Sequence, residues 1–322
     1  MFDGDKRYAS LTVDIDTLTD GMSLSDFSGD SLRRIRNISY RKSLPRILAL
    51  LEKSGIKATF FIVATDGLIG DNKKVIREIA KCGHEIANHS LSHRRDLIDI
   101  SEHDIIADIS DSGKILSDII GDKICGFRMP GCTVNTKILG ILREMGYLYD
   151  SSLNSSAIYN LAKMFYRILL GKNKTQIPYQ ALHSTKALNE PYFPSIDNIY
   201  KRANDNTGIL EIPITLVPWL SLPFMNYFLL FAGSTITYLL YNATKQKHEF
   251  INYVMHDNEF AALNDYQEYR FPFQFSTLHL RKTIKRRELC IQSILQKIES
   301  DYSFATLREY AISRKRAKKD TA

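Results

Sequence analysis

The sequence predicts an α/β fold in which strands and helices alternate along most of the chain. Apolar runs such as 57–63 are followed by amphipathic stretches such as 72–82, and the pair recurs after about 30 residues. Parallel strands need helical crossovers of this kind, and this many units favour a sheet that closes into a barrel. We therefore expect functional residues at the carboxyl ends of the strands.

The individual elements follow from apolar periodicity and from helix start and stop signals. The helix at 43–55, for example, has Ser43 as a cap, Pro45 in its first turn and Gly55 as its stop. Residues 20–42 are polar and are assigned to a loop or lid. The expected strands are 11–17, 57–63, 84–88, 124–127, 147–150, 208–215, 250–255 and 302–304. The expected helices are 43–55, 72–82, 101–120, 135–145, 157–170, 275–299 and a last one from 307 onward.

We expect one domain over residues 1–310, with an insertion at 151–245 where the period breaks, and a basic tail at 311–322. Within the insertion, residues 212–244 carry no charge, which raises the question of a membrane span. Three prolines in this segment argue against a simple spanning helix. A buried or interfacial segment, or a hairpin that dips into a membrane, is the preferred interpretation.

Composition and charge limit the classes of protein and the kinds of partner that this chain can be assigned. A chain of 322 residues with 44% hydrophobic and 25% charged residues is typical of a globular protein. The net charge of +7 gathers late, around 281–287 and 314–319, which suits a phosphate or an anionic membrane surface, although a solvated helix face accounts for it equally well. No nucleic-acid recognition motif accompanies it.

Four cysteines without C-x-x-C spacing indicate reduced thiols, and the first residues show no secretory signal. We therefore expect a cytoplasmic protein, with peripheral contact at the inner face of a membrane as an extension of that expectation. The oligomeric state is left open.

Two short stretches combine into a candidate metal site. His89 and His93 lie four residues apart, so both imidazoles can reach one divalent ion. Asp14 and Asp16 flank one apolar residue in an expected strand, which places both carboxylates on one face. The two stretches together supply two histidines, one carboxylate and a second, spare carboxylate.

Five segments resemble, in order, the motifs of the polysaccharide deacetylase family, the carbohydrate esterases of family four. They are Thr12–Asp16, His89–His93, Phe127–Gly131, Tyr149–Ser152 and Val254–His256. The resemblance extends from Leu11 to about Leu307. It implies a distorted (β/α)7 barrel, one divalent metal ion and hydrolysis of an N-acyl group on a sugar.

Carried over by position, the resemblance implies that Asp16, His89 and His93 are the metal ligands and that Asp14 is the general base. A metal with open positions polarises the amide carbonyl and acidifies water, and the free carboxylate takes the proton. Zinc suits two imidazoles and a carboxylate, while cobalt, nickel and manganese remain alternatives.

The resemblance implies three further roles near this site. Arg128 would pair with the base Asp14 and keep it ionised. His256 would be the general acid that protonates the leaving amine. Asp150 would orient His256 or hold the wall of the active site.

The first motif departs from the family pattern, because Asp14 and Asp16 are separated by Ile15 where the family usually has adjacent aspartates. This leaves the division between base and ligand open. The form is similar to members that deacylate polyprenyl-phosphate-linked sugars, and Pro191–Ser195 resembles a segment of deacetylases of exopolysaccharide biosynthesis.

We therefore expect a metal-dependent N-deacetylase, whose partner is an acylated amino-sugar glycan or a lipid-linked sugar. Two alternatives remain. One is a deformylase or amidase that hydrolyses a C–N bond of a small soluble substrate. The other is a non-catalytic glycan-binding relative.

Overall fold

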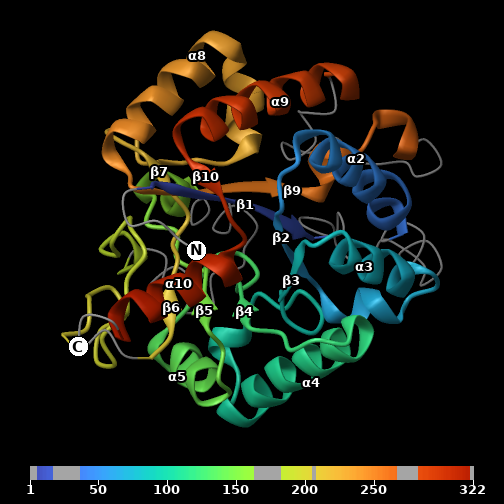
Figure 1. Ribbon diagram of the computed structural model, residues 1–322. Coiled ribbons are helices and arrows are strands. Elements are labelled where there is room, and N and C mark those ends of the chain that lie inside the picture. Colours follow the sequence, from blue (N-terminus) through green and yellow to red (C-terminus); the bar gives the residue numbers. More distant parts are fainter. Residues whose placement is uncertain (1–5, 17–36, 163–182, 205–207, 267–281, 320–322) are drawn as a thin grey trace.

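The computed structural model describes residues 6–16, 37–162, 183–204, 208–266 and 282–319. A curled, mostly parallel sheet forms its centre, and helices cover the outside (Figure 1). The predicted barrel-like α/β fold is therefore confirmed. The loop or lid expected at 20–42 is wrong over residues 37–42, which are helical and include a π-helical turn at Ser39–Ser43. Its earlier part, the later part of the helix expected at 157–170 and the start of the one expected at 275–299 lie outside the described residues.

Strand β1 (Tyr8–Ile15) organises the sheet. It pairs in parallel with β9 (Phe250–His256) along most of its length, with β2 (Thr59–Ile62) over its second half and with β10 (Ser303–Phe304) at its start. The sheet continues through four further parallel strands. These are β3 (Glu85–Asn88), β4 (Gly126–Phe127), β5 (Tyr149–Asp150) and β6 (Leu210–Glu211).

The two faces of β1 differ in chemistry, as the period of a strand requires. Leu11, Val13 and Ile15 are buried in the main hydrophobic core. Thr12 and Asp14, on the other face, are also buried but polar, and both contact the side chain of Arg128. The interior of the half-barrel therefore carries the polar groups, and the apolar face packs under the helices.

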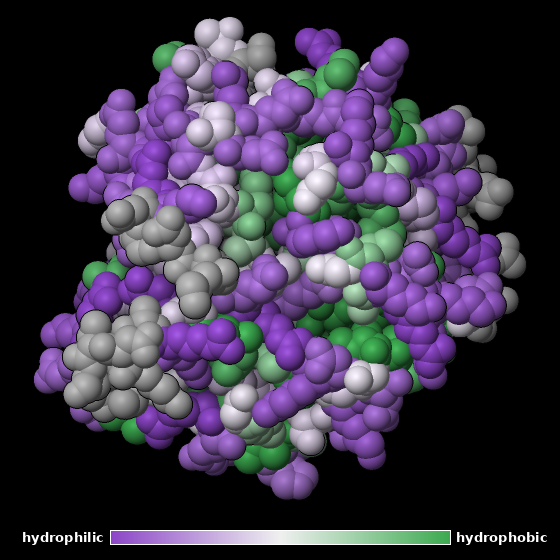
Figure 2. Space-filling view, in the orientation of Figure 1, coloured by the Kyte–Doolittle hydropathy of each residue, from purple (hydrophilic) through white to green (hydrophobic). Residues whose placement is uncertain are grey.

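The helices lie outside the sheet, and α8 packs beside α9 near β9 (Figure 1). Figure 2 shows a mostly hydrophilic outer surface, with hydrophobic side chains visible in the spaces between surface elements. The helices are α2 (Leu44–Ser54), α3 (Asn72–Lys81), α4 (Glu102–Ile120), α5 (Thr136–Glu144), α8 (Asn226–Lys247), α9 (Ile284–Asp301) and α10 (Leu307–Lys319). α10 includes most of the stretch expected as a basic tail.

The segment 212–244 forms a hairpin followed by a helix. Strands β7 (Leu216–Val217) and β8 (Leu222–Pro223) pair antiparallel, and α8 begins three residues later with a break at Gly233, whose φ is 78°. None of the helices in the described part of the chain combines the length and the apolar character that crossing a membrane requires.

Side chains bridge the space between β9 and the segment that follows β6. Asn252 in β9 donates from its side chain to the carbonyls of Ile212 and Pro213, at 3.3 and 3.2 Å. Its main-chain N–H donates to the hydroxyl of Thr215 at 2.8 Å. Side-chain hydrogen bonds therefore stabilise the curl where no β-ladder is present among the described residues.

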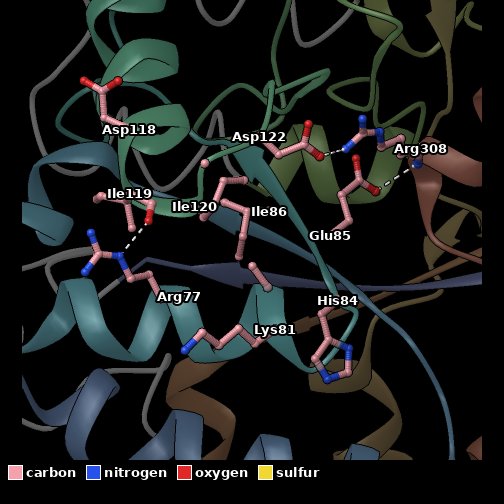
Figure 3. A pocket seen from close by; sticks show the side chains of 12 residues that line it. Arg77, Lys81, His84, Glu85, Ile86, Asp118, Ile119, Ile120, Asp122 and Arg308 are labelled. Atoms are coloured by element: carbon pink, nitrogen blue, oxygen red, sulfur yellow. Dashed lines mark hydrogen bonds and ion pairs between the residues drawn. The ribbon is translucent and has the colours of Figure 1, made fainter.

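The amino-terminal end of strand β3 carries a buried carboxyl group beside a cavity of about 560 Å³ (Figure 3). Glu85 accepts hydrogen bonds from the hydroxyls of Thr59 and Tyr149, both at 2.7 Å, and from the main-chain N–H of Arg308 at 2.9 Å. It therefore anchors the start of α10. Burial raises the pKa of Glu85 to about 7, although these hydrogen bonds oppose the shift.

Glu85 should make the stability of the protein depend on pH. Between the ordinary value of 4.5 and about 7 the folded state holds a proton that the unfolded state releases. The contribution of Glu85 to the free energy of unfolding is therefore full below pH 4.5. It declines by about 3 kcal/mol as the pH rises to 7. Urea unfolding of Glu85→Gln beside the wild type, from pH 4.5 to 8, should show a smaller decline in the variant. Parallel curves would contradict this assignment.

Candidate active site

The predicted site residues converge at the carboxyl ends of neighbouring strands. Asp14 lies near the end of β1 and Asp16 just after it, while His89 directly follows β3. Arg128 directly follows β4, and His256 is the last residue of β9, in register with Asp14. In Figure 1 the arrowheads of β1 and β9 point to the same side.

Asp16, His89 and His93 form one compact cluster. Oδ1 of Asp16 lies 3.2 Å from Nε2 of His89 and 3.3 Å from Nε2 of His93. One potential ligand atom from each residue lies within 4.8 Å of the others. Two imidazole nitrogens and one carboxylate oxygen thus point toward a common position.

The loop after β3 brings the two histidines together. Ser90 and His93 adopt positive φ values of 66° and 59°, which turn the chain back on itself. The main-chain N–H of Ser90 donates to the side-chain oxygen of Asn88 at 2.9 Å, and that of Leu91 donates to Asp108 at 2.9 Å. The two imidazole rings consequently lie 5.1 Å apart between centroids.

The donor set fits a divalent metal of the zinc type. Nδ1 of His89 donates to the main-chain carbonyl of Arg128 at 2.7 Å, so Nε2 is the ring nitrogen that faces Asp16. Metal-binding histidines usually make such a hydrogen bond with the other nitrogen. Burial opposes ionisation of Asp16, but the charge of His93 and hydrogen bonds from His89 and His93 outweigh it and hold its pKa well below the ordinary value.

Asp14 and Arg128 form a buried ion pair beside the cluster. Nη1 of Arg128 lies 2.5 Å from Oδ1 of Asp14, and the arginine has 0% of its surface exposed. The guanidinium also donates to the hydroxyl of Thr12 at 3.1 Å, and to the carbonyl and hydroxyl of Ser151, both at 2.9 Å. It stacks on the ring of Phe61 at 4.1 Å. These contacts fix the Asp14 carboxylate in one orientation.

His256 faces both aspartates across the site. Its Nε2 lies 3.9 Å from Asp14 Oδ2 and 4.0 Å from Asp16 Oδ2, and its Nδ1 lies 3.5 Å from Oε1 of Glu259. Burial disfavours the charged imidazole. The interaction with Glu259 and the charges of both aspartates outweigh burial and raise the pKa of His256 to about 10.

The carboxylate beside His256 is Glu259, which the sequence analysis did not single out. Glu259 is 1% exposed, and its Oε2 accepts from the side-chain amide of Asn226 at 2.5 Å. Tyr253 in turn donates to the side-chain oxygen of Asn226 at 2.8 Å. An acidic residue three positions after His256 at the end of a buried strand was the available signal. Asn226, the first residue of α8, therefore holds Glu259 beside His256, and Tyr253 of β9 in turn holds Asn226.

Asp150 is hydrogen-bonded to Ser152. Its carboxylate accepts from the hydroxyl of Ser152 at 2.6 Å and from the main-chain N–H of Ser152 at 3.2 Å. Ser152 in turn accepts from the main-chain N–H of Met129 at 2.8 Å. Burial raises the pKa of Asp150, which lies against the buried carboxyl of Glu211. These contacts favour the second alternative, in which Asp150 holds the wall of the active site.

Replacement of Glu259 by glutamine should test its support of His256. Glutamine keeps the size of the side chain but removes the negative charge beside Nδ1. If His256 donates a proton during turnover, we expect kcat to fall about 10- to 100-fold, with KM and metal content unchanged. Glu85→Gln is the matched control, since it is the same substitution at a buried glutamate that lies away from the site and bonds Thr59 and Tyr149. Unchanged kcat in Glu259→Gln would contradict the assignment.

The curled parallel sheet carries an Asp–His–His cluster and a buried Asp–Arg pair at its strand ends. This combination defines a class of α/β proteins whose site can hold a metal ion. Residues 5–149 match the family model described as polysaccharide deacetylase. The resemblance to this family that the motifs indicated is therefore confirmed over this part of the chain.

Two curated relatives illustrate the match. A peptidoglycan-N-acetylglucosamine deacetylase from Bacillus cereus is 29% identical over 103 residues, which is 32% of this chain and 46% of that protein. A chitin deacetylase from Pestalotiopsis sp. is 31% identical over 102 residues, which is 31% of this chain and 34% of that protein. The matches thus span less than half of these relatives.

Solved structures share the fold over nearly the whole chain. A proposed polysaccharide deacetylase from Mycobacterium smegmatis has a TM-score of 0.63 at 18% identity, covering 99% of this chain and 94% of the other. An allantoinase has a TM-score of 0.60 at 16% identity, covering 96% and 91%. At these identities the likeness shows the fold alone.

Proposed function

We propose that this protein is a metal-dependent hydrolase that removes an N-acetyl or other N-acyl group from a sugar. The substrate is a cell-surface polysaccharide or its polyprenyl-phosphate-linked precursor. The observation that carries the proposal is the Asp16–His89–His93 cluster, with the Asp14–Arg128 pair on one side and His256 on the other. The deacetylase names of the curated relatives support the choice of substrate class.

Asp16, His89 and His93 would hold the metal. When bound, a divalent ion supplies Lewis acidity that polarises an amide carbonyl and acidifies a water molecule. Arg128 holds Asp14 so that its carboxylate can accept a proton from the attacking water. The oxygen of that water adds to the carbonyl carbon, and the C–N bond then breaks. His256 donates a proton to the leaving nitrogen, so the products are a carboxylic acid and an amino sugar.

The surface of α8 and α9 is the reason to include a lipid-linked precursor among the substrates. Phe231, Ile236 and Leu239 of α8 are exposed. Lys297 of α9 lies 4.1 Å from the ring of Tyr238, so cationic and aromatic groups stand together on this surface. Apolar and cationic groups in combination favour an interface with anionic lipid. Co-sedimentation with anionic vesicles, but not with neutral ones, is the expected result, and no binding to either would remove this part of the proposal.

Metal analysis of the purified protein tests the proposed chemistry first. We expect about one divalent ion per chain in the wild type and a loss of that ion in the double variant His89→Ala/His93→Ala. His103→Ala is the matched control, because His103 is exposed and lies outside the cluster. The absence of metal from the wild type after supplementation would overturn the metal-dependent mechanism.

Substrate assays then separate the candidate activities. Acetate release from N-acetylated oligosaccharides, and from lipid-linked acetamido sugars, is expected in the wild type and should be lost in the double variant. A metal-loaded protein that hydrolyses only small soluble amides or formamides would instead support the amidase alternative.

A further inference from the structure

A second cavity, of about 460 Å³, lies beside the β7–β8 hairpin. His248 lines it and precedes β9, whereas His256 of the candidate active site ends that strand. The two positions are eight residues apart, which corresponds to roughly 26 Å along an extended strand. The cavity and the active site therefore lie toward opposite ends of β9. The lining of the cavity includes Asn189, Glu190, Trp219, Lys247 and His248.

Trp219 is the only tryptophan of the chain, and 87% of its surface is exposed. It sits in the turn between β7 and β8 with φ of 63°, and Ser221 two residues later has φ of 48°. Positive φ is unfavourable for residues other than glycine, and such strain persists where the surrounding structure imposes it. The turn thus holds a large aromatic ring in water at the edge of a cavity. Neither packing nor the local backbone preference explains this exposure of Trp219.

Neighbouring segments hold this turn in place. Ser156 donates from its hydroxyl to the carbonyl of Ser221. His248, which is buried, uses Nε2 to donate to the carbonyl of Leu216 at 2.9 Å, and its Nδ1 lies 2.6 Å from Oε1 of Glu190. The hairpin, the start of β9 and the segment around Glu190 are thereby joined. The cavity wall is consequently pre-organised for a ligand.

We propose that this cavity is a carbohydrate-binding subsite that holds one sugar unit of a glycan. The face of the Trp219 indole would pack on the C–H face of a pyranose ring, since an aromatic ring offers a large apolar surface. The Glu190 carboxylate would accept hydrogen bonds from sugar hydroxyls. Asn189 and Lys247 add polar groups to the same wall.

The polar lining favours a sugar over a membrane as the occupant. If Trp219 entered an anionic bilayer interface, the carboxylate of Glu190 at the same cavity would face lipid phosphates of like charge. A sugar satisfies that carboxylate with its hydroxyls while covering the indole. The distance from His256 exceeds what one ring spans, so the ligand is a remote unit of an extended glycan. That identification of the ligand rests on the proposed function.

Tryptophan emission gives a direct test, because Trp219 is the only tryptophan. The titration uses the wild-type chain and two soluble tetrasaccharides, one of N-acetylglucosamine and one of glucose. We expect a saturable emission change with at least one of them, and protection of Trp219 from acrylamide quenching. Glu190→Gln, which keeps Trp219, should weaken binding about tenfold or more. Unchanged emission and quenching with both sugars would overturn the proposal, as would changes produced by anionic vesicles alone.

The binding test does not depend on catalysis. Asp14→Asn should bind the tetrasaccharide as the wild type does, so a chain without deacetylase activity can still show the subsite. In an active enzyme, Trp219→Ala should raise the apparent KM for a polymeric glycan about tenfold and leave KM for a disaccharide unchanged. Equal effects on both substrates would contradict a remote subsite. Circular dichroism of the variant checks that it is folded.

Discussion

Replacement of Asp14 by asparagine is expected to lower kcat by a factor on the order of a thousand while metal content stays at the wild-type level. Asparagine has nearly the same shape as aspartate but cannot accept a proton from the attacking water, and general-base catalysis typically contributes a factor of about 100 to 10,000. The contacts of Asp14 are to Arg128, whereas Asp16 contacts both histidines. Initial rates and elemental analysis of the same preparation measure the two quantities.

Asp16→Asn is the matched partner of this experiment. It should lose metal as well as activity, because Asp16 supplies the carboxylate of the cluster. The pair of variants therefore decides how the two carboxylates divide the roles of base and ligand. Loss of metal in Asp14→Asn to the same extent as in Asp16→Asn would show that both bind the ion and would remove Asp14 as the free base.

Replacement of Arg128 by methionine is expected to be strongly destabilising. Arg128 is fully buried and is the ion-pair partner of Asp14, which is 2% exposed. Removing one member of a buried pair leaves an uncompensated charge, which typically costs about 3–5 kcal/mol of unfolding free energy. The hydroxyl of Thr12 and the carbonyl of Ser151 also lose their donor. Urea denaturation at neutral pH measures the change.

The double variant Arg128→Met/Asp14→Asn separates loss of charge balance from loss of packing. If the unpaired carboxylate causes the damage, the second substitution should recover a large part of the lost stability. The double variant should still be inactive, because it lacks the general base. Equal stability of the single and double variants would assign the cost to the cavity and to the unsatisfied polar groups around Thr12 and Ser151.

The strand and helix order could be predicted from the sequence because its signals are local. The helix at 43–55 is confirmed as α2, with Pro45 in its first turn and Gly55 at φ of 69°, and these positions follow from residues adjacent in the chain. The predicted cap is wrong, because Ser43 makes no side-chain capping bond and a π-helical turn over Ser39–Ser43 precedes α2. The helix α8 could not be predicted with equal ease. It lies inside a segment whose apolar residues are spread around the helix, so no periodicity marks a buried face.

Strand period and short spacing are local properties, so the position of Asp14 and Asp16 near the end of one strand, and the reach of His89 and His93 to one ion, could be predicted from the sequence. The contact between Glu259 and His256 could not be predicted in this way, because it depends on the approach of Asn226 and on the packing of distant segments. The exposure of Trp219 likewise depends on what packs around the hairpin. Local spacing determines which groups share a strand or turn, and long-range packing determines which of them are close together.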